Sequence, residues 1–243
     1  MYRIRFHGRG GQGIKTAGRI LGTTFFLEGF KVQDAPLYGA ERRGVPLFAS
    51  VRAAHKPIHE RGMIRTPDLV VVADDTLLAV SAAEVLFGVT PQTVLLLDSV
   101  EPAPVWQQRL NFPGRLLGLP VTAEVEDRAA LPASGAICAG ATARLIGLRR
   151  GSLEQALSEE LASIDPAVSP HDLDQALAAY DRMAEHAGIV GQGETPSVSA
   201  YSTSTWWVEP PLDEVGPTAP AIILKKAIAK CSHERLAGTH RGG

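Results

Sequence analysis

The N-terminal part of the chain changes from one hydrophobic period to another. Residues 2–7 alternate in the manner of a strand, and residues 14–29 carry apolar side chains at helical spacing. The apolar face of this second segment consists of Ile14, Ala17, Leu21 and Phe25. The run Gly8-Arg9-Gly10-Gly11-Gln12-Gly13 separates the two segments, and glycines interrupt regular structure. The pattern therefore predicts a strand, a glycine-rich turn and a helix.

Short apolar runs predict the remaining strands. Strands are expected at residues 31–34, 69–73, 94–97 and 116–121. The runs at 69–73 and 94–97 are continuously apolar, which is typical of strands buried on both faces of a parallel sheet. Residues 46–52 and 58–61, separated by His55-Lys56-Pro57, predict a β-hairpin.

Helical patterns alternate with these strands. Helices are expected at residues 76–86, 134–148, 152–164 and 171–186. Asp74 and Asp75 stand where a strand end becomes a helix cap. Repeated strand–helix–strand units predict the α/β class.

The amino-acid composition of the sequence changes after Gly188. Residues 191–205 are rich in Gly, Ser, Thr and Pro, which is typical of a linker. We therefore predict an α/β domain over residues 1–188, followed over residues 189–243 by a linker and a partner-docking tail. Trp206 and Trp207 lie in a Pro-rich stretch of this tail, and large aromatic side chains supply much interface energy. Both are predicted to anchor the tail in a groove of a partner.

Composition and charge exclude several classes of protein. The 243 residues are 45% hydrophobic and carry a net charge of −2, so no basic field favours nucleic acid. No apolar run reaches the ~18 residues that a membrane span needs, and the start lacks a signal-peptide pattern. We expect a cytoplasmic protein. Cys138 and Cys231 lie far apart without a CxxC motif or histidine spacing, so no disulfide, metal site or cluster is expected in this chain.

The glycine run has the form G-x-G-x-x-G, in which backbone N–H groups and a helix N-terminus can bind a phosphate. Asp34 follows about 20 residues later, where a Rossmann fold places the carboxylate that binds a ribose. A stand-alone nucleotide-binding protein or dehydrogenase is therefore one interpretation, and a tight turn without any ligand is another. His7 is the one histidine next to this run that could take part in chemistry.

A second motif, Tyr38-Gly39-Ala40-Glu41-Arg42-Arg43-Gly44, carries three charges between glycines. Glu41 can pair with either Arg42 or Arg43 and leave the other arginine for an anionic substrate or a partner subunit. A solvated turn is the alternative interpretation of the same residues.

The two motifs together resemble a known family. His7-Gly8-Arg9-Gly10-Gly11-Gln12-Gly13 with Thr16-Ala17, then the motif ending in Glu41-Arg42-Arg43-Gly44, is similar to the gamma subunit of 2-oxoacid:acceptor oxidoreductases. This family includes pyruvate:ferredoxin and ketoisovalerate:ferredoxin oxidoreductases. The resemblance continues through Leu69–Asp74 and Leu116-Gly118-Pro120 to about Gly188.

The resemblance implies a three-layer α/β domain with a central, mainly parallel sheet, a Rossmann-like glycine turn, an additional β-hairpin and an extended C-terminal tail. It implies one subunit of a multisubunit enzyme that converts a 2-oxoacid and coenzyme A to an acyl-CoA and CO2. Thiamine diphosphate, magnesium and iron–sulfur clusters are then carried by partner subunits. The chain itself is expected to bind none of them, to hold no catalytic residue and to be inactive alone.

Coenzyme A binding and closure of the thiamine site are the roles that the resemblance implies for this domain. The expected cofactor-binding residues are Gly8, Gly10, Gly11, Gln12, Gly13, Thr16 and Arg19. Arg19 stands where some relatives have a phosphate-binding lysine. The tail around Trp206 is similar to a linker that leads toward a ferredoxin-like module in relatives, although no cluster ligands follow it here. The 2-oxoacid and the electron acceptor, ferredoxin or NAD through another subunit, stay open.

Overall fold

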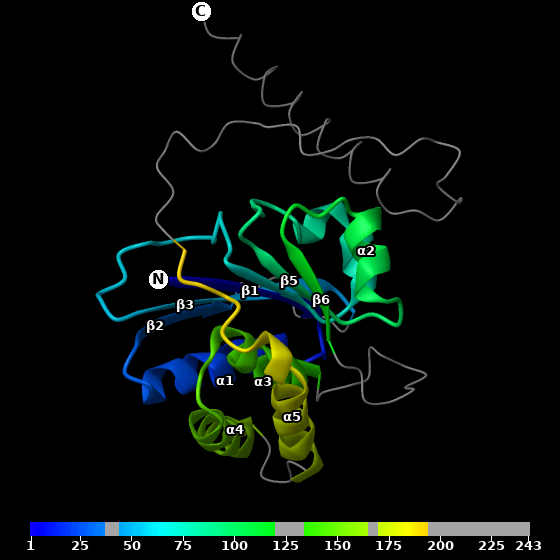
Figure 1. Ribbon diagram of the computed structural model, residues 1–243. Coiled ribbons are helices and arrows are strands. Elements are labelled where there is room, and N and C mark those ends of the chain that lie inside the picture. The colour runs from blue at the N-terminus through cyan, green and yellow to red at the C-terminus, as the bar shows by residue number, and fades with distance from the viewer. Residues whose placement is uncertain (37–43, 120–133, 165–169, 194–243) are drawn as a thin grey trace, which may run out of the picture.

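The computed structural model describes residues 1–36, 44–119, 134–164 and 170–193 (Figure 1). Within these residues a six-stranded sheet has the strand order β2-β3-β1-β4-β5-β6. The strands are β1 (Tyr2–Arg9), β2 (Lys31–Pro36), β3 (Pro46–Ala54), β4 (Leu69–Val72), β5 (Val94–Leu97) and β6 (Arg115–Gly118). Each predicted strand is thus present except the one at residues 58–61, which do not form a strand.

The sheet is mixed. Strand β1 pairs in parallel with β4, which is followed by β5 and β6 in the same direction. On its other side β1 pairs antiparallel with β3, and β3 pairs antiparallel with β2. The predicted parallel sheet therefore describes β1, β4, β5 and β6, whereas β2 and β3 form an antiparallel extension.

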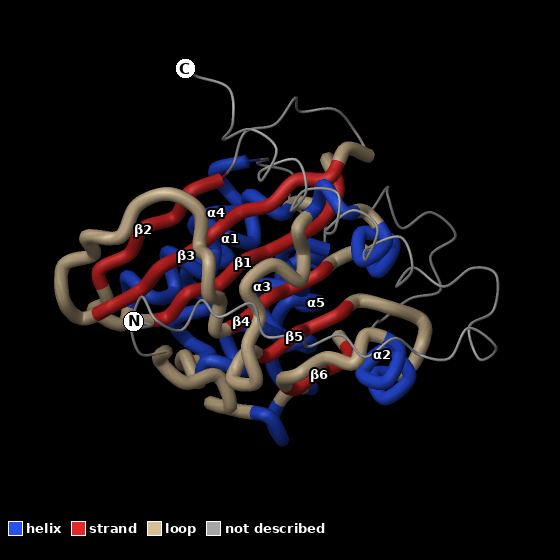
Figure 2. The backbone as a smooth tube through the Cα atoms, turned by 90° about the horizontal axis from the view of Figure 1, so that it is seen from above, coloured by secondary structure: helices blue, strands red, loops and turns tan. Residues whose placement is uncertain are grey.

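Helices cover both faces of the sheet (Figures 1 and 2). One face carries α1 (Ile14–Leu27), α3 (Ser134–Ile146), α4 (Arg150–Ile164) and α5 (Pro170–Arg182). The other face carries α2 (Ala103–Arg109) and the short 3-10 helices η1 (Asp75–Ala79) and η2 (Ser81–Ala83). The domain thus has three layers, as the resemblance implied.

Strand β4 shows why the central strands read as continuous apolar runs. Leu69 and Val71 belong to the core beneath α1 and α3, whereas Val70 and Val72 belong to the core beneath η1 and α2. Because successive side chains of a strand point to opposite faces, a strand covered on both faces has no polar positions. Each such side chain contributes roughly 1.5–3 kcal/mol when fully buried.

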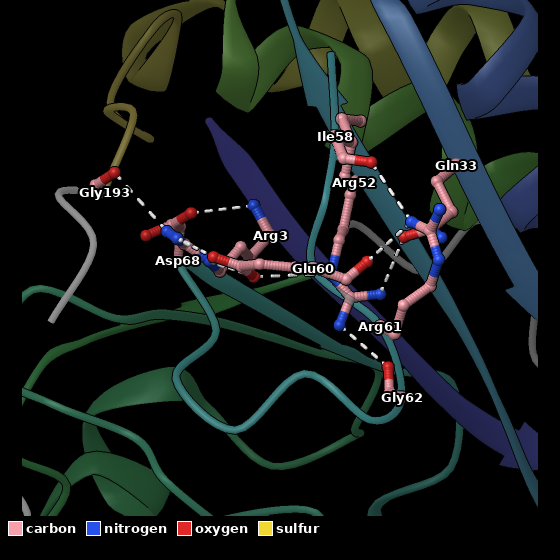
Figure 3. A network of polar contacts seen from close by, with 9 residues as sticks. All are labelled: Arg3, Gln33, Arg52, Ile58, Glu60, Arg61, Gly62, Asp68 and Gly193. Atoms are coloured by element: carbon pink, nitrogen blue, oxygen red, sulfur yellow. Dashed lines mark hydrogen bonds and ion pairs between the residues drawn. The ribbon is translucent and has the colours of Figure 1, made fainter. Parts of the chain in front are cut away.

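The predicted hairpin between residues 46–52 and 58–61 is wrong. Both edges of β3 are already occupied, one by β1 and the other by β2, so a further strand has no edge to join. Instead, Glu60 forms ion pairs with Arg3 of β1 at 2.7 Å and with Arg52 of β3 at 3.6 Å (Figure 3). Residues 58–61 therefore lie across the sheet as a loop that neutralises buried arginines.

One predicted helix differs from the structure, and one helix of the structure was not predicted. The expected helix over residues 76–86 is replaced by η1 and η2, because Val80 between them has extended dihedral angles. Asp74 does cap the first of these, and its side chain accepts a hydrogen bond from the Thr76 backbone N–H. Helix α2 was not predicted. Pro102 at its N-cap and Pro104 in its first turn occupy positions that a helix tolerates well.

The chain continues to contact the domain beyond the predicted boundary at residue 188. Following α5 and η4 (Ala184–His186), the N–H of Val190 donates to Leu145 O at 3.0 Å. The N-terminal amino group donates to Gln192 at 3.2 Å, and Arg3 Nη1 donates to Gly193 O at 3.4 Å (Figure 3). The described chain therefore stays in contact with the domain as far as residue 193. Trp206, Trp207 and Cys231 lie outside the described residues.

Cys138 lies in α3 as a fully buried free thiol, as expected of a small apolar residue. Burial raises its pKa, which opposes formation of a reactive thiolate. No helix among the described residues is long and apolar enough to cross a membrane. In the same part of the chain, no group of three or more His, Cys, Asp or Glu side chains could hold a metal ion.

Candidate functional site

The carboxyl ends of the parallel strands β1, β4 and β5 meet at one edge of the sheet, here called the carboxyl edge. After β1 the chain first adds β2 and β3 on one side and then crosses to β4 on the other. Ligands of open α/β sheets bind outside the carboxyl ends of the strands where the order reverses in this way. The glycine loop, Gly10–Gly13, leaves β1 at this point.

The glycine loop is built from backbone that only glycine adopts easily. Gly11 and Gly13 have φ angles of 101° and 70°. Gly8 packs so closely that an added Cβ would lie 2.4 Å from Cγ1 of Ile14. Gly13 begins α1, whose N-terminus has no side-chain cap and no acidic residue in its first turn. This end of α1 therefore keeps the positive end of its dipole available for an anion.

The Gln12 side chain is fully buried. The side-chain Oε1 accepts a hydrogen bond from the Arg9 backbone N–H at 2.7 Å. The backbone N–H of Gln12 donates to Arg9 O at 3.1 Å. Gln12 therefore holds the glycine loop closed from within. Thr16, by contrast, is half-buried in the first turn of α1.

A second helix N-terminus lies against the glycine loop. An added Cβ at Gly135, in the first turn of α3, would lie 2.0 Å from Gly13 O. The first turn of α3 also lacks acidic residues. The N-terminal ends of α1 and α3 thus converge at Gly13, a relationship that the sequence reasoning missed because residues 13 and 135 have no local signal in common.

Arg9 connects the glycine loop to two other segments. Its Nε forms an ion pair with Asp74 at 2.7 Å, and its Nη2 donates to Thr76 Oγ1 at 2.7 Å. Its Nη1 donates to Gly44 O at 2.9 Å. Sequence reasoning treated Arg9 as a variable position of the glycine motif and missed these contacts.

The second sequence motif ends beside the first. Gly10 N–H donates to Val45 O at 2.9 Å, and Gly44 N–H donates to Gly10 O at 3.2 Å. These bonds continue the antiparallel ladder between β1 and β3. Glu41, Arg42 and Arg43 themselves lie outside the described residues, but Gly44, which follows them, lies directly on the glycine loop.

Arg19 is engaged elsewhere. Its guanidinium forms an ion pair with Glu160 of α4 at 2.8 Å, and Thr23 Oγ1 donates to the same carboxylate at 2.7 Å. The side chain of Arg19 is half-exposed and ties α1 to α4. The structure therefore does not bring Arg19 to the glycine loop.

His7 does not face the glycine loop either. It lies on the sheet face that carries Arg5, stacks on Phe48 with ring centroids 5.6 Å apart, and is 3% exposed. Burial, followed by the charge of Arg5, lowers the pKa of His7 to about 3, against a smaller opposing effect of the Ala83 backbone. The imidazole is therefore neutral at physiological pH and forms part of the packed interior.

Asp34 is too far away to bind a ribose at the glycine loop. It pairs with Val51 of β3, which pairs with Ile4 in the first half of β1. Asp34 is thus two strands, or about 10 Å, to the side of β1 and about 20 Å short of Gly10 along the strand direction. A Rossmann fold needs the second strand adjacent to the first, and here β3 separates them.

The fold is an α/β domain with a mixed six-stranded sheet, and a glycine-rich loop lies at its carboxyl edge. Residues 3–182 match the pyruvate ferredoxin/flavodoxin oxidoreductase family, so the chain belongs to this family. The predicted resemblance to its gamma-type subunits is confirmed by the relatives, and the chain is accordingly a subunit of an oxidoreductase.

Two curated relatives illustrate the similarity. The pyruvate/ketoisovalerate oxidoreductases common subunit gamma of Pyrococcus furiosus is 36% identical over 161 residues, 65% of this chain and 86% of the relative. The pyruvate synthase subunit PorC of Methanosarcina barkeri is 35% identical over 147 residues, 60% of this chain and 79% of the relative.

Solved structures support the same fold. The pyruvate oxidoreductase subunit PORC of Thermotoga maritima has a TM-score of 0.57 at 28% identity, covering 76% of this chain and 95% of that one. A 2-oxoglutarate:ferredoxin oxidoreductase of Magnetococcus marinus, solved with 2-oxoglutarate, coenzyme A and succinyl-CoA bound, has a TM-score of 0.55 at 19% identity. It covers 76% of this chain and 31% of its own, and shows likeness of fold alone.

Proposed function

We propose that this chain is the gamma-type subunit of a thiamine-dependent 2-oxoacid:acceptor oxidoreductase, and that its carboxyl edge binds a phosphate of coenzyme A and helps to close the active site. In this proposal thiamine diphosphate, magnesium and iron–sulfur clusters belong to partner subunits. The names of the relatives support the reaction class. The observation that carries the proposed site is the convergence of α1 and α3 at the glycine loop.

The physical basis is the charge of the ligand. Coenzyme A carries several phosphate charges, and an anion at an exposed helix N-terminus gains up to ~1 kcal/mol from the dipole. Gly11 and Gly13 allow the backbone to approach such an anion closely, because a Cβ would block it. Gly10 supports the loop from β1, since its N–H is bonded to Val45 O. Thr16 adds a hydroxyl donor in the first turn.

The other predicted ligand residues take supporting roles in this proposal. Gly8 and Gln12 are buried and shape the loop from within. Arg19 fixes α4 against α1 through Glu160, so its contribution to coenzyme A binding is indirect. Glu41, Arg42 and Arg43 remain candidates for a substrate or subunit contact, because Gly44 adjoins the glycine loop.

The assembled enzyme provides the test. Thr16→Val removes one hydroxyl and should raise the KM for coenzyme A about 5-fold, since a hydrogen bond contributes about 1 kcal/mol. The KM for the 2-oxoacid should stay unchanged. Thr23→Val is the matched control in the same helix, because Thr23 bonds to Glu160 and should leave both constants unaltered. An equal rise in both KM values, or none for coenzyme A, would overturn the site.

The alternative of a stand-alone dehydrogenase makes the opposite prediction. A nucleotide-binding Rossmann protein binds NAD(H) when purified alone, with Asp34 on the ribose. The register of β2, β3 and β1 opposes that geometry. Titration calorimetry of the purified chain with NAD⁺ and NADH should therefore show no binding.

A further inference from the structure

We propose that Arg9 is a positioning residue of the carboxyl edge, which holds the glycine loop in register with the end of β4 and with the end of the Tyr38–Gly44 motif. The inference about the geometry stands on the contacts of Arg9. Its consequence for coenzyme A rests on the proposed function.

The guanidinium of Arg9 bonds in two directions at once. Toward the end of β4 it bonds to Asp74 and Thr76, both at 2.7 Å. Toward the opposite neighbour, β3, it donates to Gly44 O at 2.9 Å. A planar fork with donors on three nitrogens can span such a set of acceptors, whereas the single ammonium of lysine cannot.

The backbone of Arg9 is fixed as firmly as its side chain. Gln12 binds both the N–H and the carbonyl oxygen of Arg9, within the glycine loop itself. The next residue, Gly10, exchanges backbone hydrogen bonds with Gly44 and Val45. A displacement of the guanidinium is therefore transmitted directly to the loop that is proposed to hold the anion.

The partner of Arg9 explains why we assign it a positioning role and not that of a ligand. Asp74 neutralises its charge in a pair whose side chains are only 24% and 13% exposed. Asp74 in turn accepts from the Thr76 N–H at 3.0 Å and so caps η1. Arg9 thus connects three consecutive strands of the sheet, β3, β1 and β4, at the edge where a ligand is expected.

The test uses the assembled enzyme carrying Arg9→Ala, Arg9→Lys or Asp74→Asn. Hydrogen exchange of residues 10–13 and 44–45 should accelerate about 10-fold in Arg9→Ala, because opening there becomes easier. The KM for coenzyme A should rise about 10-fold or more, as expected for losing bonds to a charged group, with the KM for the 2-oxoacid unchanged. Arg9→Lys should recover part of each effect.

Arg109→Ala is the matched control, because Arg109 forms a comparable ion pair with Glu101 at 2.6 Å on α2. It should change neither quantity. In a double-mutant cycle, adding Asp74→Asn to Arg9→Ala should cost little more than either change alone. If Arg9→Ala fails to assemble, the same hydrogen-exchange and KM measurements are made on Arg9→Lys and Asp74→Asn, and their outcomes test the positioning role in the same way.

The two readouts separate the two proposals. Faster exchange with an unchanged KM for coenzyme A supports the positioning role and overturns the proposed coenzyme A site. A raised KM with unchanged exchange would overturn positioning, because Arg9 would then act on the ligand directly. If neither the exchange rate nor the KM for coenzyme A changed, the positioning role of Arg9 would also be overturned.

Discussion

The carboxylate of Asp68, just before β4, holds the backbone of Gly193 near the end of the described chain. Gly193 N–H bonds to this carboxylate, and an added Cβ at Gly193 would lie 2.0 Å from Asp68 Oδ1. The N–H of Arg3 donates to the same carboxylate at 2.7 Å (Figure 3). Asp68 thus joins the start of β1 to the segment that follows α5, at the end of the sheet opposite the glycine loop.

Gly193→Ala should open this contact. The added Cβ would force the Asp68 carboxylate to shift and break its contact, so residues 188–193 should exchange their amide hydrogens faster while the sheet keeps its protection. Mass spectrometry of exchanging peptides measures both. Gly191→Ala is the control, because nothing lies within 4 Å of its added Cβ. Equal exchange in the two variants would show that Asp68 does not hold this segment.

Asp68 should also give stability a distinctive pH dependence. Burial raises its pKa from 3.8 to about 6, against the opposing effects of Arg3 and Gly193. The folded chain therefore binds the proton more tightly than the unfolded chain, and this contribution to the free energy of unfolding grows as the pH falls from about 7 to about 4. Its slope is about 1 kcal/mol per pH unit.

Asp68→Asn isolates this effect because asparagine keeps an acceptor oxygen but does not titrate in this range. Urea unfolding at several pH values should show wild type gaining stability relative to the variant on acidification. A relative loss would contradict the raised pKa.

The contact between α3 and the glycine loop should tolerate no side chain. Gly135→Ala places a methyl group 2.0 Å from Gly13 O and should destabilise the chain by about 1–3 kcal/mol. Gly151→Ala in α4 is the control, since its added Cβ meets nothing within 4 Å. It should stabilise by about 0.4–1 kcal/mol. Urea midpoints measure both, and similar midpoints would show that α3 shifts freely.

His7 should remain neutral far below the usual pH of histidine titration. Its pKa of about 3, lowered from 6.5 by burial, means that the unfolded chain binds the proton more tightly. This contribution to stability is complete above pH 6.5 and is lost as the pH falls toward 3. Nitrogen-15 chemical shifts should show a neutral His7 imidazole at pH about 5, and titration near pH ~6.5 in urea. A positively charged His7 imidazole in the folded chain at pH about 5 would refute the lowered pKa.

Local patterns predicted most elements of this fold but not the order of its strands. The apolar run at Leu69–Val72 and the glycines after β1 each carry their signal in neighbouring residues. The position of β3 between β1 and β2 depends on pairing between distant segments, which local patterns do not contain. The false hairpin at residues 58–61 and the false ribose partner Asp34 both follow from this single omission.

The contacts of the predicted site residues could not be read from the sequence. The glycine motif predicted the turn after β1, but the Gln12 side chain bonds to Arg9 inside the loop, and the Arg19 side chain pairs with Glu160 of α4. Whether a polar side chain meets a ligand or a neighbouring helix depends on packing. Sequence spacing along one helix could not show that α4 would offer a carboxylate to Arg19.

The central position of β1 has a consequence for synthesis. Among the described strands it is synthesised first, and β3 and β4, which pair with it, follow much later in the chain. At about 5–20 residues per second, both edges of β1 wait unpaired for several seconds. Exposed strand edges recruit other chains unless charges protect them. Arg3 and Arg5, which are buried in the finished domain, place two positive charges on the nascent strand, and charges of this kind oppose such association.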